Sequence, residues 1–230
     1  MNDTIWQATA LVIPLIIAIV FHEVAHGYVA RLLGDPTASE LGRLSLNPLR
    51  HIDLFGTIIM PGLLKLAGLP VFGFAKPVPV VRARLRDPRR GMMLVAAAGP
   101  ASNLVMGLLG AVLLGVLMRP YAGVQEPTGL MLFLQLNLLN FIVLNVFLAL
   151  FNLLPVPPFD GGHIVEGLLP RALAERFAGL HRQALLVMIG LLVVLPTISP
   201  SLNVVGALVQ PPVQWLSGHY LDLAQTIARG

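Results

Sequence analysis

The chain has 230 residues, of which 56% are hydrophobic and 11% are charged. Soluble domains carry roughly 25% charged residues, so this composition excludes an ordinary water-soluble fold and predicts an integral membrane protein. There is no cysteine, which excludes disulfides and thiolate metal sites and leaves His, Asp or Glu to hold any metal. The net charge of +4 does not indicate a nucleic-acid partner, because the basic residues gather in one loop, as they do beside membrane spans.

Apolar runs along the sequence predict the membrane spans. Three runs are clearly long enough to cross a bilayer: residues 5–33, 92–118 and 130–154. Two shorter runs that are interrupted or ended by proline predict further spans at residues 184–198 and 202–216, with Pro211 and Pro212 ending the last one. We therefore predict an all-α polytopic membrane protein with about five or six transmembrane helices.

A different kind of segment lies between the first two clear spans. Residues 54–81 are apolar, but glycines and prolines interrupt them repeatedly. Non-helical backbone at membrane depth is tolerated only where protein buries it or where it lines a wet cavity. The sequence thus predicts a re-entrant or extended membrane-associated segment here.

The distribution of basic residues predicts the orientation. Ten of the fifteen Lys and Arg residues lie in the stretch from Arg31, near the end of the first clear span, to Arg90, just before the second, and the tail before the first span has none. By the positive-inside rule that loop is cytoplasmic and the N-terminus is outside. The first and third spans then both run inward, which brings residues 22–26 and 159–162 to a similar depth on the cytoplasmic side.

A His-Glu-x-x-His motif, His22-Glu23-Val24-Ala25-His26, lies within the first span. Four residues are a little more than one helical turn, so His22 and His26 share one face and suit two ligands of one zinc ion, with Glu23 beside them to take a proton from water. A catalytic zinc uses three protein ligands, and Asp160 is the candidate third. The sequence around it, Pro-Pro-Phe-Asp-Gly-Gly, also reads as a plain turn.

Five ordered motifs resemble the site-2 protease family of intramembrane zinc metalloproteases, in its short prokaryotic form without a PDZ or CBS module. They are FHEVAHGYVA, LSLNPLRHIDLFGT, FAKPVPV, AAAGPASN and NLLPVPPFDGG. The resemblance implies one Zn²⁺ per chain on His22, His26 and Asp160, with Glu23 as general base. It also implies that Asn152 helps to hold the substrate or the developing oxyanion. The expected protease domain covers residues 1–230, with a catalytic core at about 5–162 and C-terminal spans at about 183–218.

Other polar residues at membrane depth have less specific readings. Asn137, Asn145 and Asn152 fall on one helical stripe and suit hydrogen bonds between helices, and Asn103 reads more readily as structural than as catalytic. No role is predicted for His51 or Asp53. His163 follows the Asp160 turn and suits either a partner of a ligand or a solvated interfacial position.

The leading hypothesis is a zinc-dependent endopeptidase that cuts a transmembrane protein substrate near its cytoplasmic end. It would reside as a multi-pass protein in a prokaryotic inner or plasma membrane, in contact with the lipid bilayer, with no nucleic-acid partner and no predicted oligomeric state. The alternatives are a metal-ion transporter, which also places His and Asp at membrane depth, and a non-proteolytic membrane metal-binding protein. A different zincin fold would use a downstream glutamate such as Glu166 as the third ligand.

Overall fold

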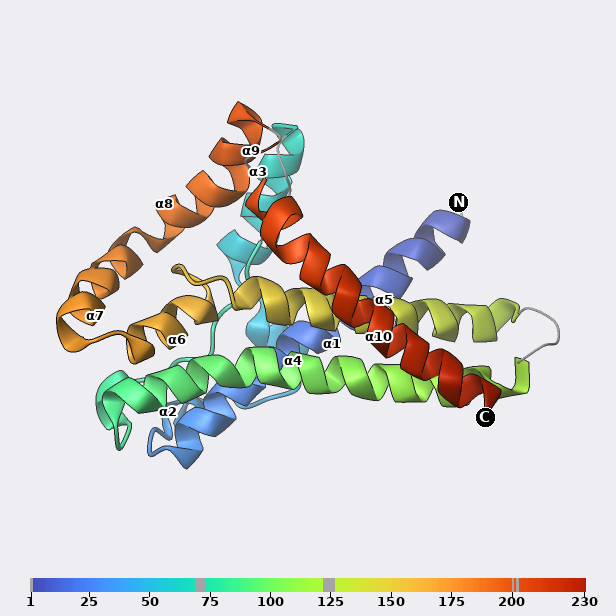
Figure 1. Cartoon of the computed structure of the whole chain (residues 1–230), viewed down its shortest axis with the longest axis horizontal. Coiled ribbons are helices and arrows are strands. Elements are labelled where there is room, and N and C mark those ends of the chain that lie inside the picture. The colour runs from blue at the N-terminus through green and yellow to red at the C-terminus, as the bar shows by residue number, and fades with distance from the viewer. Residues whose placement is uncertain (1, 69–72, 122–126, 200, 202) are drawn as a thin grey trace.

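The computed structural model describes most of the chain: residues 2–68, 73–121, 127–199, 201 and 203–230. Within these ranges the secondary structure is helical, without a β-strand, which confirms the predicted all-α class. Three long helices form the centre, namely α1 (Asn2–Leu32), α4 (Pro88–Met118) and α5 (Gly129–Asn152). Each of the three contacts the other two, and Figure 1 shows α4 and α5 side by side with α1 against them.

The ends of these helices follow from local sequence. Gly34 adopts a φ of 110°, which lets the chain turn sharply just after α1. Asp87 caps the start of α4 by accepting hydrogen bonds from the backbone N–H groups of Arg89 and Arg90, and Pro88 occupies the first turn. The clear apolar runs therefore became helices whose bounds lie within a few residues of those predicted.

The surface of the helices suits lipid. Four helical stretches of the described chain are long and apolar enough to cross a membrane: Trp6–Leu32, Pro88–Tyr121, Gly129–Asn152 and Arg171–Ile198. Large apolar side chains also point outward, such as Leu109 and Leu113 on α4, which are 57% and 55% exposed. So much exposed apolar surface is incompatible with water and compatible with a bilayer. The protein is an integral membrane protein.

The fourth stretch contains several short helical elements that follow one another closely. After α6 (Asp160–Leu168) come α7 (Arg171–Ala178), η5 (Gly179–Gln183), α8 (Ala184–Ile189), η6 (Gly190–Val194) and α9 (Leu195–Ile198). Figure 1 shows α8 and α9 standing away from the α4–α5 pair. Met188 and Leu192 from this region pack with Val209 and Val213, which belong to the C-terminal helical segment.

The last predicted span is wrong in one respect. Pro211 and Pro212 do not end a helix; they lie in the first turn of α10 (Gln210–Arg229), which follows the π-helical turn η8 (Val205–Val209). Proline is well accommodated in a first turn because its missing N–H has no intrahelical partner there. This helix carries Asp222 and Arg229 and is too polar to count among the four apolar stretches. It crosses α4 and α5 obliquely and packs on both.

The connection between α1 and α4 contains short helices and an extended stretch. It comprises α2 (Thr37–Glu40), η1 (Pro48–His51), the π-helical turn η2 (Leu54–Ile59), α3 (Met60–Leu66), an irregular extended segment over residues 73–81, and η3 (Arg82–Arg84). Residues 69–72 of the predicted re-entrant segment lie outside the described residues. The remainder is partly helical and partly extended, as the glycines and prolines led us to expect.

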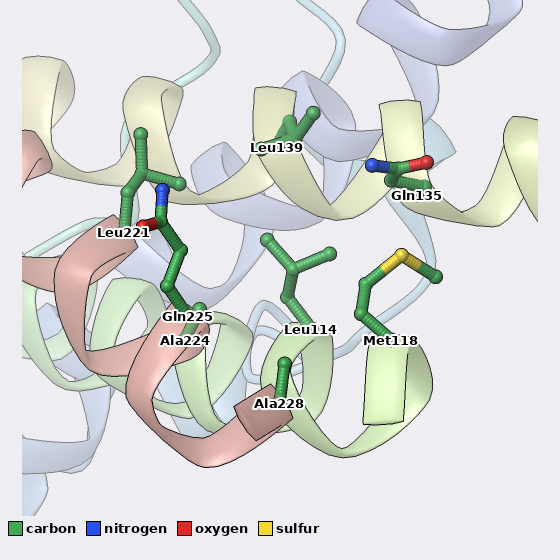
Figure 2. A pocket seen from close by; sticks show the side chains of 8 residues that line it. All are labelled: Leu114, Met118, Gln135, Leu139, Leu221, Ala224, Gln225 and Ala228. Atoms are coloured by element: carbon green, nitrogen blue, oxygen red, sulfur yellow. The ribbon is translucent and has the colours of Figure 1, made fainter. Parts of the chain in front are cut away.

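A cavity of about 200 Å³ lies between α4, α5 and α10 (Figure 2). Its lining is apolar apart from Gln135 and Gln225, and it includes Leu114 on α4. At 1.5 Å of rise per residue, Leu114 lies about 22 Å along α4 from Gly99, which contacts the histidine pair described below. The cavity contains no titratable side chain, so it is not a candidate catalytic centre.

Candidate metal centre

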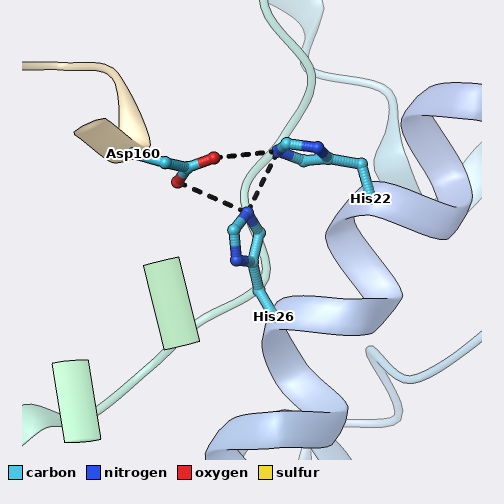
Figure 3. Close-up of side chains that lie close together, drawn as sticks. All are labelled: His22, His26 and Asp160. Atoms are coloured by element: carbon cyan, nitrogen blue, oxygen red, sulfur yellow. Dashed lines mark hydrogen bonds and ion pairs between the residues drawn. The ribbon is translucent and has the colours of Figure 1, made fainter. Parts of the chain in front are cut away.

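His22, His26 and Asp160 meet at one point (Figure 3). The Nε2 atoms of His22 and His26 lie 3.0 Å apart. The Asp160 carboxylate lies 3.2 Å from His22 Nε2 through Oδ2 and 3.4 Å from His26 Nε2 through Oδ1. Both imidazoles are buried, and Asp160 is mostly buried. The structure thus brings together the three ligand candidates that the sequence placed far apart.

The two imidazoles lie against α4 at Gly99. A Cβ atom at this position would lie 2.4 Å from His26 Nε2 and 2.6 Å from His22 Cε1. Any other residue here would displace one ring or move the helix, since real Cβ contacts are longer than this. Gly99 therefore sets the close approach of α1 and α4 that encloses the histidine pair.

Asp160 is the first residue of α6, immediately after the loop that follows α5. The two glycines after it are required by close backbone contacts. A Cβ atom on Gly161 would lie 2.3 Å from the carbonyl oxygen of Leu153, and one on Gly162 would lie 2.9 Å from the backbone nitrogen of Pro157. The Asp-Gly-Gly sequence thus lets the loop fold tightly back on α6 and aims the carboxylate at α1.

The His22 ring is held from behind by an asparagine network. Its Nδ1 atom lies 2.6 Å from Asn103 Oδ1. The Asn103 side-chain amide donates to the carbonyl oxygen of Ala18 and to Asn145 Oδ1, at 3.2 and 2.8 Å. Because both amide hydrogens already have acceptors, the Asn103 oxygen must face His22 and accept from its Nδ1–H. In the neutral ring, Nε2 of His22 is then the nitrogen that carries the lone pair.

The same logic applies to His26. Its Nδ1 atom lies 2.7 Å from the backbone carbonyl oxygen of Val95, which can only accept. Nδ1 therefore carries the ring proton, and the lone pair of Nε2 points at His22 and Asp160. Two neutral rings in these tautomers and an ionised carboxylate have no hydrogen to share among them, and Asp160 Oδ2 is buried without a hydrogen-bond partner.

This donor set fits a zinc ion. Bonds of about 2.1 Å in tetrahedral geometry place neighbouring ligand atoms about 3.4 Å apart, close to the separations of 3.0, 3.2 and 3.4 Å found here. Imidazoles that donate their other N–H to a carbonyl or amide oxygen are the usual arrangement of zinc-binding histidines. Three ligands leave one coordination position for water or substrate.

Glu23 lies beside the cluster on α1 and contacts the extended segment. Its Oε2 atom accepts a hydrogen bond of 2.8 Å from the backbone N–H of Val78. Val78 is buried, and a Cβ atom on Gly27 would lie 2.7 Å from its side chain, so that glycine gives the segment room against α1. The carboxylate predicted as general base is thereby anchored through one oxygen next to residues 75–78.

The asparagine stripe of α5 has mixed roles. Asn145 bonds across to Asn103, as the stripe predicted, but Asn137 and Asn152 donate to the carbonyl oxygens of Phe133 and Leu148 in their own helix. Asn140, which lies outside the stripe, donates a hydrogen bond to the Ala10 carbonyl oxygen of α1.

Asn152 is the last residue of α5, and no hydrogen bond within the described chain joins it to the three clustered side chains.

The remaining polar residues in question lie elsewhere. His51 bonds through Nε2 to the Ser45 carbonyl oxygen, and Asp53 caps η2 by accepting from the Gly56 N–H. Glu166, the alternative third ligand, pairs with Arg82 at 2.6 Å and belongs to a cluster that does not include His22 or His26. His163 lies beside Glu166 and not in the first cluster. The carboxylate next to the two histidines is that of Asp160.

The sequence did not predict which groups accept hydrogen bonds from the two histidine rings. The hydrogen bonds between helices that were predicted for Asn103 and Asn145 are present, but the contacts of Asn103 and of the Val95 carbonyl oxygen with the two histidine rings were not predicted. A backbone carbonyl leaves no sequence signal. A buried asparagine in an apolar helix does leave one, because such a side chain must find a partner.

Comparison with known proteins agrees with this chemistry. The family model "Peptidase family M50" matches residues 131–197. The protein named "Putative zinc metalloprotease YwhC" from Bacillus subtilis (strain 168) is 48% identical over 164 residues, which cover 70% of this chain and 69% of that protein. "Putative zinc metalloprotease Rip2" from Mycolicibacterium smegmatis is 29% identical over 188 residues, 82% of this chain and 66% of that protein.

Rip2 from Mycobacterium tuberculosis (strain H37Rv) gives a similar result, with 29% identity over 186 residues, 80% of this chain and 66% of that protein. The chain thus spans about two thirds of the length of these relatives. No solved structure matches the chain significantly.

Proposed function

The chain belongs to the site-2 protease family, peptidase family M50, and is a zinc metalloendopeptidase; from this premise we propose that it cleaves a membrane protein in or near a transmembrane segment, at a site open to the cytoplasm. The convergence of two histidines and an aspartate carries this proposal. His22, His26 and Asp160 would hold the zinc ion, and Glu23, which lies beside them on α1, would be the general base. The membrane-spanning scaffold supports a substrate that itself lies in the bilayer.

Zinc, when bound, supplies a Lewis acid that polarises the scissile carbonyl and lowers the pKa of water to about 7. Glu23 takes the proton of the attacking water and later delivers it to the leaving amine. Its Oε2 atom is occupied by the Val78 N–H, so Oε1 is the oxygen that moves the proton. The anchored carboxylate needs little reorganisation before it acts, which favours catalysis.

Asn152 is proposed to help stabilise the oxyanion. One of its amide hydrogens bonds to the Leu148 carbonyl oxygen, and an asparagine amide has two hydrogens to donate. The second hydrogen can serve the substrate once the substrate is in place. Donors aimed at a developing oxyanion typically contribute a factor of about 10²–10³ to turnover.

A transmembrane substrate must unwind before cleavage, because the carbonyls of a helix are hydrogen-bonded internally and leaving them unpaired in lipid costs several kcal/mol each. The extended segment at residues 73–81 offers an edge on which unwound backbone can pair. The N–H groups of Phe74, Lys76 and Val78 all bond inward, to Gly56, His51 and Glu23. In an extended chain the intervening residues face the other way, so Ala75 presents its N–H to that outer edge.

Prolines flank this position. Pro77 and Pro79 have no N–H, so Ala75 is the one N–H donor of the outer edge between residues 75 and 79. A single donor makes a short pairing site, which suits a substrate that must bind briefly and leave. The competing interpretation is a loop that only fills space beside α1.

The cytoplasmic orientation of the site rests on charge. The connection from α1 to α4 carries seven of the fifteen Lys and Arg residues, and three more lie in the adjoining helix ends. The same connection carries the extended segment beside Glu23. Positive residues concentrate on the cytoplasmic side of membrane proteins. The water needed for hydrolysis would then enter from the cytoplasm.

The decisive test replaces Glu23 with glutamine. Glu23→Gln keeps the size of the side chain and an oxygen for the Val78 N–H, so the fold and the zinc content should persist while cleavage of a model transmembrane substrate falls about 10²–10⁴-fold. Glu175→Gln, the same change at an exposed position on α7, is the control and should cleave normally. Undiminished cleavage by Glu23→Gln would refute the proposed mechanism. A metal-ion transporter would instead show zinc flux in vesicles without any cleavage by the wild type.

The edge is tested at Ala75. Ala75→Pro removes the single outward N–H and should reduce cleavage at least about tenfold, with zinc content unchanged, whereas Ala75→Val keeps the N–H and should remain active. Val78→Pro would be a poor probe, because it also removes the hydrogen bond to Glu23. Normal cleavage by Ala75→Pro would favour the space-filling interpretation.

A further inference from the structure

A second cluster of histidine and carboxylate side chains lies outside the proposed catalytic centre. His163 and Glu166 occupy neighbouring turns on one face of α6, and His181 comes from η5. Glu166 Oε2 lies 3.4 Å from His181 Nε2 and 3.7 Å from His163 Nδ1. From this arrangement we infer that the cluster is a second binding site for a divalent transition-metal ion of the zinc class.

The donor atoms support a metal rather than a hydrogen-bonded network. His163 Nδ1 and His181 Nε2 are buried atoms with no hydrogen-bond partner, although both face the same carboxylate. Glu166 is 5% exposed, and its Oε2 atom is the one that lies nearest to both imidazoles. One ligand atom from each of the three residues lies within 4.8 Å of the others. Two imidazoles and one carboxylate form a ligand set that zinc commonly uses.

Arg82 orients the carboxylate of this cluster. Its Nη1 atom donates to Glu166 Oε1 at 2.6 Å, so the other oxygen, Oε2, faces the two imidazoles. Carboxylates that bind metals are themselves usually hydrogen-bonded in this way. The arginine charge also opposes a cation, although the side chain is 44% exposed and solvent screens part of its field. The second site should therefore bind more weakly than the first.

The two rings must move slightly to bind an ion. They are stacked, with centroids 4.3 Å apart and planes 19° from parallel. Parallel planes at this separation cannot both contain one metal ion, so one imidazole has to turn about its side-chain bonds. The side chains of His163 and His181 are 28% and 23% exposed, which leaves room for that rotation.

A bound ion would add a link between α6 and the connection that joins α7 to α8. Asp160 begins α6, His163 and Glu166 follow on the same helix, and His181 belongs to the connection between α7 and α8. A cation on the second cluster would therefore bind the η5 connection to α6, the helix whose first residue is Asp160. The site is distinct from the catalytic centre and shares no residue with it.

Metal stoichiometry tests the inference. Untagged protein in detergent is equilibrated with Zn²⁺, passed over a desalting column at fixed free zinc and analysed for metal. Wild type should hold two zinc ions per chain, and His181→Ala should hold one. His219→Ala, which removes an exposed histidine on α10, should still hold two. The double variant His22→Ala/His26→Ala should hold one, because only the second site remains.

Two results would overturn the inference: a single zinc ion in the wild type, or two in His181→Ala. Glu166→Gln provides a second variant should His181→Ala not fold, and it too should lose one ion. Cobalt(II) in the His22→Ala/His26→Ala background gives an independent readout. Visible absorption bands typical of nitrogen and oxygen ligands should appear there and be absent when His163→Asn is added; bands that persist would also count against the site.

Discussion

The two histidine–carboxylate clusters use the same residue types but differ in how their rings are held. At the first cluster each imidazole donates its Nδ1–H to a fixed acceptor, Asn103 for His22 and the Val95 carbonyl for His26, and the Nε2 atoms converge. At the second cluster neither facing ring nitrogen has a hydrogen bond, and the rings stack on one another.

The difference shows what holds an imidazole ring in its metal-binding orientation in this fold. Holding a ring from behind needs a buried partner on a neighbouring helix, and α4 supplies both partners for α1. The second cluster lies between a short helix and a connection, where no such partner is present among the described residues. We therefore expect tight binding at the first cluster and weaker, adaptable binding at the second.

The largest expected effect comes from Gly99→Ala. The added methyl would lie within 2.6 Å of both imidazoles of the first cluster, which are anchored and cannot retreat freely. We expect loss of the catalytic zinc ion and at least about a 100-fold fall in cleavage, because displacements near 1 Å have that effect on catalytic geometry. Metal analysis and cleavage assays measure both.

Gly218→Ala is the matched control for that change. A Cβ atom at Gly218 in α10 would meet nothing within 4 Å, so this variant should be fully active and slightly more stable. The second cluster should keep its ion in both variants. Normal zinc content in Gly99→Ala would show that the first cluster is less rigid than the contrast between the two clusters implies.

A smaller effect is expected for Asn103→Ala. The variant leaves His22 Nδ1 without its acceptor and should weaken zinc binding about 10–100-fold, the usual cost of losing a partner behind a ligand. Competition with a chelator of known affinity measures the change. Asn137→Ala, which removes an asparagine bonded only within its own helix, should bind zinc normally. Equal affinities in the two variants would contradict the anchoring role.

The smallest effect concerns Asp35, which lies outside both clusters and ties the end of α1 to the extended segment. Burial raises the pKa of its carboxyl, but hydrogen bonds from Thr37 and from the Val81 N–H outweigh burial and hold the pKa below its ordinary value. The ionised form therefore stabilises the fold above the unfolded pKa of about 3.9, and this contribution is lost as pH falls through the folded pKa.

Asp35→Asn should lower the free energy of unfolding by about 1–3 kcal/mol at pH 7, the usual range for a hydrogen bond to a charged group. The difference from wild type should shrink below about pH 4. Thermal unfolding in detergent at several pH values measures it. At pH 7 the variant should keep the zinc ions of both clusters. Loss of the ion from the first cluster alone would show that Asp35 supports the catalytic centre directly.

The C-terminal region shows where sequence patterns fail. Pro211 and Pro212 suit the end of one span and the start of another helix equally well, and hydropathy cannot choose between them. Packing decides that a helix begins here, because α10 buries Val213 and Ala224 against the other helices. The long spans were predictable because about 20 apolar residues leave a helix as the main way to satisfy the backbone in lipid.

The sequence by itself determined the membrane class, the three main spans and the identities of His22, Glu23, His26 and Asp160 as candidates, because hydropathy and helical spacing are local properties. Only the tertiary structure decided that Asp160 rather than Glu166 faces the two histidines, that Asn103 and Val95 orient the rings, and that His163, Glu166 and His181 meet. These outcomes depend on which helices pack together and how closely. Long-range contacts of this kind, set at positions such as Gly99, leave no periodic signal in the chain.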